Sequence, residues 1–238
     1  MDWRRLEATR AAARSIALAE VRPSIRDFTH YLGAGRRSMA VVPLILRRDP
    51  ATGAALAPFD APAFAAAADD LEIAGIAVAT EPTEFGGRLE DLRAVGAAAT
   101  APILRFDCVS DERRLYESRA VGADAVLVPV AVVGDLLPRL VELARAIHVT
   151  VVAEVATTDE CDAAVAARVP IIVLAYGRLA LAAHAPTRIP LLAEDAAHEP
   201  SDLAPLVGTV DGVIIGAAIL GAPDPLGRLA AFLAAAGA

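Results

Sequence analysis

Eight short apolar runs, separated by segments with helical character, constrain most strongly what this chain of 238 residues can fold into. The runs are Ala40–Leu46, Ile73–Thr80, Pro102–Cys108, Ala125–Val130, Thr150–Val155, Ile171–Ala175, Ile189–Ala193 and Gly212–Ile215. Continuous apolar runs that alternate with helices are typical of buried parallel strands, and eight of them indicate closure of the sheet. We therefore predict an α/β fold, a (β/α)8 TIM barrel, whose functional residues follow the carboxyl ends of the strands.

The remaining sequence predicts one domain over residues 1–238, of which residues 1–38 form an N-terminal helical extension. We expect an amphipathic helix from about Asp2 to Ala19 and a second helical turn within Ile25–Leu32. Between Tyr176 and Ile189 the chain has barely the ~10 to 12 residues that a crossover needs. The sixth helix should therefore be shortened.

Charge and composition exclude several classes of function. The basic residues are all arginine, so a lysine Schiff base is excluded. A net charge of −8 argues against nucleic acid as a partner. No uncharged apolar run approaches the ~18 to 20 residues that span a bilayer. Cys108 and Cys161 have neither metal-site spacing nor the number that a disulfide framework needs. We expect a cytoplasmic protein without metal, cofactor, membrane or nucleic-acid partner.

Three segments in the right order resemble the indole-3-glycerol phosphate synthase family. Phe85–Val95 resembles the family's F-x-G-S-L-E-D-L segment after strand two, Pro102–Asp107 its P-V-L-R-K-D strand, and Tyr116–Leu127 its Y-E-A-R-A-x-G-A-D-A-V-L-L segment. The resemblance covers roughly residues 20 to 233. It implies a decarboxylating ring closure of a carboxyphenylamino-deoxyribulose phosphate, which needs a general acid and cations for phosphate and carboxylate.

Most positions that the resemblance assigns to this chemistry carry unsuitable side chains. The family's general-acid lysine falls on Phe106, and the E-x-K of strand one on Pro43 and Ile45. The asparagine and arginine after strand six fall on Ala175 and Gly177, with Arg178 one residue further along. The S-E-S-G of strand seven becomes Ala193–Ala196, and the G-S after strand eight becomes Gly216 and Ala217. Of the functional positions, only Glu154, Glu194 and Gly216 match.

The surviving carboxylates suggest a different chemistry. On the implied register, Glu154 and Glu194 point into the barrel beside Phe106, without a lysine partner, and burial without a counter-charge raises a carboxyl pKa. Our hypothesis is that Glu154 or Glu194, with Asp195, transfers protons in a cyclisation, isomerisation or dehydration of a neutral, largely apolar small molecule in specialised metabolism. Alternatively, these carboxylates only hydrogen-bond barrel neighbours.

Several further residues are candidates for substrate binding. They are Phe85, Phe106, Tyr176, Arg178, His184, Gly216 and Ala217. His184 and His198 follow strands six and seven, where an imidazole can act as a base or a metal ligand, although ordinary solvated loop positions are the favoured explanation. Phe85 and Tyr176 can contact a substrate or simply pack.

Two other functions remain open at this stage. The barrel can be a non-catalytic pseudoenzyme that acts as a binding or scaffold subunit with a protein partner. The least favoured hypothesis is an active synthase in tryptophan biosynthesis. Small inward positions such as Ala175, Ala193 and Ala217 favour an open ligand cavity over a filled scaffold.

Overall fold

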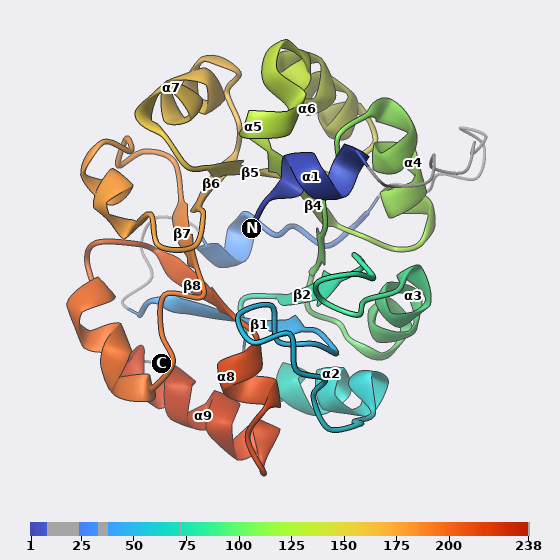
Figure 1. Ribbon diagram of the computed structural model, residues 1–238, viewed down its shortest axis with the longest axis vertical. Coiled ribbons are helices and arrows are strands. Elements are labelled where there is room, and N and C mark those ends of the chain that lie inside the picture. Colours follow the sequence, from blue (N-terminus) through green and yellow to red (C-terminus); the bar gives the residue numbers. More distant parts are fainter. Residues whose placement is uncertain (9–23, 33–37, 72, 238) are drawn as a thin grey trace.

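The computed structural model describes residues 1–8, 24–32, 38–71 and 73–237. Its centre is a closed barrel of eight parallel strands in chain order, so the predicted fold class is confirmed (Figure 1). The strands are β1 (Ala40–Ile45), β2 (Ile76–Ala79), β3 (Ile103–Phe106), β4 (Ala125–Pro129), β5 (Thr150–Val155), β6 (Ile171–Leu174), β7 (Leu191–Glu194) and β8 (Gly212–Ile215). Pairing of β1 with β8, with Val42 opposite Ile214, closes the ring.

Helices surround the barrel and connect consecutive strands (Figure 1). They are α2 (Ala61–Asp69), α3 (Leu89–Ala98), α4 (Glu112–Ala120), α5 (Val130–Val133), η3 (Gly134–Leu136), α6 (Leu137–Ala146), α7 (Thr158–Ala166), η4 (Leu179–Ala183), η5 (Pro200–Leu206), α8 (Ala217–Leu220) and α9 (Pro225–Ala235). Four of them begin where a side-chain oxygen accepts a backbone N–H of the first turn, at Asp60, Asp111, Thr157 and Asp224.

The sixth crossover is short, as the spacing predicts, and consists of the single 3-10 segment η4. The seventh crossover is also a 3-10 segment, η5, which the sequence analysis did not anticipate. Pro205 lies inside η5, and a proline has no N–H for a helical hydrogen bond. These two crossovers, which contain 3-10 segments instead of α-helices, precede and follow β7.

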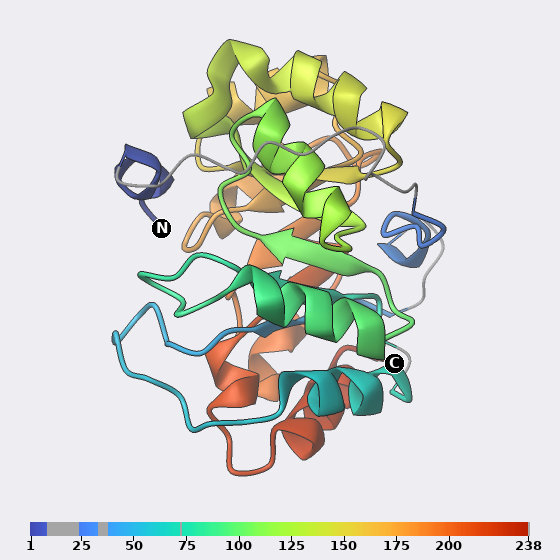
Figure 2. The ribbon, with the colours of Figure 1, turned by 90° about the vertical axis from the view of Figure 1, so that its right-hand side faces the viewer.

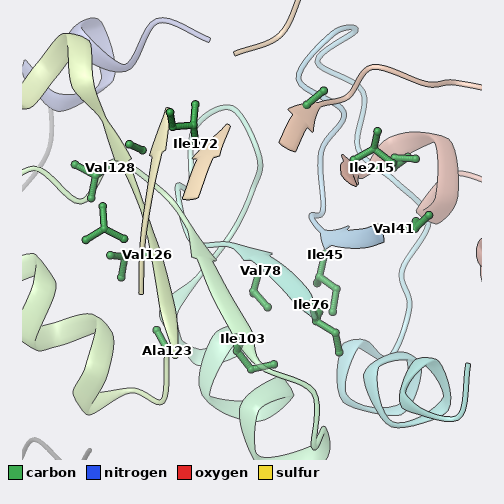
Figure 3. Close-up of a cluster of buried hydrophobic side chains, with 14 of the residues drawn as sticks. Val41, Ile45, Ile76, Val78, Ile103, Ala123, Val126, Val128, Ile172 and Ile215 are labelled. Carbon is green, nitrogen blue, oxygen red and sulfur yellow. The ribbon is translucent and has the colours of Figure 1, made fainter. Parts of the chain in front are cut away.

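Two apolar clusters fill the molecule. The outer cluster lies between the strands and the surrounding helices and includes Val41, Ile45 and Ile215 (Figure 3). The inner cluster fills the barrel and includes Val42, Leu44 and Leu46. The sequence interpretation that placed Pro43 and Ile45 inside the barrel is therefore wrong by one residue.

The N-terminal extension touches both ends of the barrel. Helix α1 (Trp3–Ala8) lies over the centre of the ring, whereas the 3-10 turn η2 (His30–Leu32) lies at the opposite end (Figures 1 and 2). The expected helix over Asp2–Ala19 is described only as far as Ala8. The turn predicted within Ile25–Leu32 is confined to its last three residues, and Ile25 is fully exposed.

An ion pair fixes the segment between these two ends. Asp124, which is buried at the start of β4, binds the Arg26 guanidinium at 2.7 Å and the Ser24 hydroxyl. The Asp124 Oδ2 that binds Arg26 also accepts the backbone N–H of Ile103, and Oδ1 accepts the Ser24 hydroxyl. No helix of the described chain is long and apolar enough to cross a membrane.

Candidate functional site

A cavity of about 230 Å³ opens at the carboxyl ends of β1, β7 and β8. Six of the sequence-predicted residues contribute to its wall: Phe85, Tyr176, Glu194, Asp195, Gly216 and Ala217. Most of the remaining wall is apolar side chain and N-terminal segment, namely Met1, Asp2, Arg5, Leu44, Leu46, Pro50, Ala51, Glu84 and Ile214. The barrel mouth therefore forms a small, largely apolar chamber with carboxylates on one side.

A buried pair of glutamates lies beneath this chamber. Glu154 near the end of β5 and Glu194 at the end of β7 are 5% and 8% exposed, and the protonation of each carboxyl depends on that of the other. The strand between them, β6, places Val173 opposite Glu154 in the ladder. Two acidic groups from different strands thus meet in an apolar interior.

Burial controls the protonation of this pair. Desolvation raises the pKa of Glu154 well above its usual value, and the negative charge of Glu194 raises it further. Desolvation also raises the pKa of Glu194 to about 7, and the neighbouring Asp195 contributes in the same direction. The amino group of Met1 acts oppositely on both groups. Because the two carboxyls interact directly, they titrate as a pair.

Asp195 follows directly in an uncommon backbone conformation. Its φ of 45° lies in the left-handed region, which aspartate tolerates better than most residues. The backbone is fixed there by a hydrogen bond from its N–H to the carbonyl of Ile214 at 2.8 Å. Desolvation raises the pKa of the Asp195 carboxyl, and the charge of Asp49 raises it further.

Three aromatic rings form the floor of the mouth. Phe106, at the position where the resemblance places the general-acid lysine, is fully buried with its ring centroid 5.5 Å from that of Phe85. The Trp3 ring lies over both, 6.1 Å from each centroid. Phe85 packs on Trp3 of the N-terminal extension and also lines the chamber, so it remains a candidate for substrate contact. Phe106 has no access to the chamber while Trp3 covers it.

Trp3 is the functional-site residue that sequence reasoning missed. It is 4% exposed, although it lies on a six-residue helix at the edge of the chain. A second cavity of about 120 Å³, lined by Trp3 and Glu154, lies beside the first, and Met1 and Asp2 line both. The only signal in the sequence is that Trp3 is the single tryptophan of the chain.

Arginines around the mouth form ion pairs with acidic residues other than Glu154, Glu194 and Asp195. Arg5 pairs with Glu84 at 2.5 Å, and Arg47 binds Asp91 at 2.7 Å. Arg228 binds Glu199 at 2.8 Å. Within the described residues, no ion pair joins any arginine to Glu154, Glu194 or Asp195. The carboxylates of the mouth therefore have no basic side chain as a partner there.

The other predicted residues divide into two groups. Tyr176 is 53% exposed at the rim of the chamber, and Arg178 lines an adjoining shallow hollow together with Asp195. His184 instead bonds Asp162 on α7 at 2.9 Å and lines neither hollow, so the structure does not bring it to the site. His198 is exposed near Asp195. Among the described residues, no cluster of three or more potential ligands could hold a metal.

Comparison with known proteins identifies the family. The family model described as indole-3-glycerol phosphate synthase matches residues 4–176. The chain belongs to this family. A relative from Kineococcus radiotolerans named indole-3-glycerol phosphate synthase is 36% identical over 221 residues, covering 86% of this chain and 79% of its own. One from Nocardioides sp. with the same name is 35% identical over 238 residues, covering 94% and 90%.

Solved structures with little sequence similarity share the fold. Orotidine 5'-phosphate decarboxylase from Pyrococcus horikoshii superposes with a TM-score of 0.65 at 16% identity, over 83% of this chain and 99% of that one. The tryptophan synthase alpha chain from Legionella pneumophila gives 0.63 at 12% identity, over 90% and 98%. At this level of identity the likeness concerns the barrel alone.

The strand register refines how this member departs from its family's motifs. Leu44 on β1 and Leu46 directly after it pack inside the barrel, whereas Ile45, on which the resemblance places one residue of the E-x-K motif, packs in the outer cluster. Both leucines line the chamber. The correction leaves the conclusion unchanged, since the inward side chains at this strand are apolar on either register.

Proposed function

We propose that this barrel performs carboxylate acid/base chemistry on a largely apolar small molecule without a phosphate group, such as a cyclisation, isomerisation or dehydration in specialised metabolism. The observation that carries the proposal is the buried Glu154–Glu194 pair, which lies beneath a largely apolar chamber and forms no ion pair with an arginine of the described residues; Arg5, which lines the chamber, is bound to Glu84. Catalytic groups are often titratable residues whose pKa values are shifted by burial and by a charged neighbour. The proposal places the protein in the cytoplasm, with a small molecule as its partner.

The parent synthase reaction is disfavoured by the same surroundings. A missing general acid costs about 10²- to 10⁴-fold in rate, and each lost charge-assisted contact to an anion about 1.5 to 3 kcal/mol. Asp195 adds repulsion of about 4 kcal/mol toward a unit negative charge 4 Å away, at an effective dielectric of about 20. Phe106, Leu46 and Asp195 together oppose both the proton transfer and the binding of phosphate.

A proton-transfer cycle can be written with the two glutamates alone. Glu194, ionised, removes a proton from a substrate in the chamber and then, as an acid, returns it to another atom of the same substrate. Glu154, which lies beneath the chamber, stays protonated and holds the pKa of Glu194 in the working range through their direct interaction. The number of protons on substrate and enzyme is conserved, so an isomerisation needs no further reactant. The pair titrates as a unit, so activity should follow a bell-shaped pH profile.

The test begins with a search for substrates. Phosphate-free cyclic and aromatic compounds are screened for thermal stabilisation of the protein, and each ligand found is followed for conversion by NMR. Glu154→Gln and Glu194→Gln should each lower turnover by about 10²- to 10⁴-fold. Glu90→Gln on the exposed face of α3 serves as control and should retain full activity. Full activity in both pair variants would refute the proposal.

A second assay addresses the parent reaction directly. The carboxyphenylamino-deoxyribulose phosphate is incubated with the protein, and the formation of indole-3-glycerol phosphate is followed by the fluorescence of its indole ring. We expect no turnover above the uncatalysed rate. Measurable turnover would show that the assignment of Phe106 as the lost acid position is wrong and would return the chain to the family's named activity.

A non-catalytic binding role is the competing explanation. It is weakened by the open chamber, because a scaffold has no need to keep small side chains such as Ala217 beside a buried, partly charged pair. If screening gives ligands that bind but are never converted, the binding role is the better description.

A further inference from the structure

The acidic side of the chamber has hydrogen-bonding capacity that the protein does not use. Oε2 of Glu194 and Oδ1 of Asp195 are buried and accept no hydrogen bond within the described structure. Glu194 is more than nine-tenths buried and lines the chamber. A buried carboxylate oxygen without a donor costs free energy, so a partner from outside the chain is the natural complement.

Asp195 occupies the meeting point of the hollows at the mouth. It lines the chamber of about 230 Å³, the hollow beside Tyr176 and Arg178, and a wide open groove that runs toward His198 and Asp224. A ligand that enters from any of these directions passes its carboxylate. Asp195 is therefore placed to select ligands by charge.

The surroundings of Asp195 are negative. The groove also contains Asp49, and the charge of Asp49 is felt at Asp195. Five basic groups face this region: His198, which is exposed, Arg228, which is bound to Glu199 and to the carbonyl of His198, Arg178 in the adjoining hollow, and Arg5 and the amino group of Met1 at the chamber. Within the described residues, no arginine forms an ion pair with Asp195 or Glu194. A cation brought by the ligand would supply the counter-charge.

We infer that the ligand of this site carries one protonated amine, which Asp195 binds with Glu194 as its second acceptor, at the end of the chamber where the family's motif predicts a phosphate. The inference rests on the proposed function and narrows it. The ligand is apolar where it meets Leu44, Phe85 and Ile214, and positively charged only at the Asp195 end. The strictly neutral substrate expected from the sequence is thereby replaced by a monocation.

Shape supports this placement. Ala217, which lines the chamber together with Asp195, presents no long side chain, so an aminoalkyl group can reach Asp195. A volume of about 230 Å³ is at the small end for ligand sites. It suits one ring with a short amine chain.

The test compares three probes that share a phenyl ring on a two-carbon chain and differ in the charge of the end group. Binding of 2-phenylethylammonium, 2-phenylethanol and 3-phenylpropionate to the full chain is measured by calorimetry at pH 7.5. A charge-assisted hydrogen bond predicts about 10- to 100-fold tighter binding of the ammonium than of the alcohol, and no binding of the carboxylate. Equal affinities for ammonium and alcohol, preference for the anion, or no ammonium binding at millimolar concentration would each overturn the inference.

Variants assign the effect to a residue. Asp195→Asn keeps the size and tolerates the left-handed backbone, and should bring ammonium and alcohol to equal affinity. Glu90→Gln on exposed α3 should leave the ratio unchanged. Circular dichroism and thermal unfolding confirm that each variant is folded. An unchanged ratio in Asp195→Asn would overturn the assignment.

The outcome is separable from that of the proposed function. Glu154→Gln should retain the preference for ammonium, because Glu154 lies below the chamber beside Trp3, while losing turnover. If the protein prefers the ammonium probe but turnover is the same in the glutamate variants as in the wild type, the amine site is supported and the acid/base cycle is rejected. If turnover depends on the glutamates but the ammonium probe is not preferred, only the amine site is rejected.

Discussion

At the scale of single residues, the best-determined feature is the buried Arg105 behind β3. Its guanidinium donates to Asp107 at 3.1 Å, to Glu117 at 3.0 Å and to the hydroxyls of Thr80 and Ser118 at 3.0 Å. The side chain is 2% exposed, so it pairs with both carboxylates in a nearly dry environment. Removing one partner of a buried ion pair leaves an uncompensated charge.

Arg105→Met should therefore lower the free energy of unfolding by about 3 to 5 kcal/mol, measured by urea denaturation at pH 7. Arg139→Met is the matched control, because Arg139 pairs with Glu112 on the surface at 58% exposure. Its effect should stay within about 1 kcal/mol. Equal effects of the two variants would contradict the structural role of Arg105.

Alternation along β3 predicts from sequence that Arg105 and Asp107 point away from the barrel interior, and the structure confirms their pairing. The same reasoning failed on β1, where Ala40–Ile45 is buried on both faces and apolar throughout. Without a polar residue, alternation gives no sign of which side chains face inward. The left-handed backbone of Asp195 carries no sequence signal either, since it follows from its hydrogen bond to β8.

At the scale of secondary-structure elements, sequence predicts the strands better than their connections. Seven of the eight predicted apolar runs contain a strand of the barrel, and the seventh run along the chain overlaps β7, which ends one residue later at Glu194; burial on both faces demands largely apolar sequence. The short sixth crossover follows from counting residues. The 3-10 form of η5 depends on proline position and packing, and was not anticipated.

Helix α1 is the element whose role could be found only in three dimensions. It is fixed over the mouth by the buried side chains of Trp3 and Leu6, and by a hydrogen bond from Arg4 to the carbonyl of Ala131 at 2.8 Å. Because Trp3 is the only tryptophan, its fluorescence reports this docking directly. The emission should be that of a buried indole, with little quenching by acrylamide.

Leu6→Ala should undock α1. Loss of a buried leucine costs about 2 to 5 kcal/mol, which a helix of six residues has little other packing to offset. We expect a red shift of the emission and a several-fold rise in acrylamide quenching, with far-ultraviolet circular dichroism almost unchanged. Leu136→Ala, at a site 55% exposed, is the control and should change neither. A buried indole in Leu6→Ala would show that α1 is not held by this side chain.

At the scale of the whole molecule, the scaffold and the chemistry are specified by different parts of the chain. The barrel follows from apolar patterning that many sequences share, which is why structures at 12% to 16% identity superpose on it. The site follows from a few positions at the strand ends. Sequence identified Glu154, Glu194 and Asp195 among them, but their lack of cationic partners in the described chain required the positions of the surrounding arginines.

The buried glutamates should make global stability depend on pH in an unusual direction. Their pKa values are raised in the folded state, so between the unfolded and folded pKa values the folded chain binds more protons than the unfolded one. The stability they contribute is complete below the unfolded pKa of about 4.5 and is lost as pH rises through the folded values. For Glu194, with a folded pKa of about 7, the loss is about 3 kcal/mol.

Urea unfolding from pH 5 to pH 8 should therefore show a falling free energy of unfolding. Glu194→Gln removes the charge that must be buried, so it should match the wild type near pH 5 and exceed its stability near pH 8. Below about pH 4 both proteins should weaken, because the Asp91 carboxyl, whose pKa its partner Arg47 lowers, becomes protonated. A wild-type stability that is flat or rising from pH 5 to pH 8 would mean that the glutamate pair is not buried as described, and the acid/base proposal would lose its physical basis.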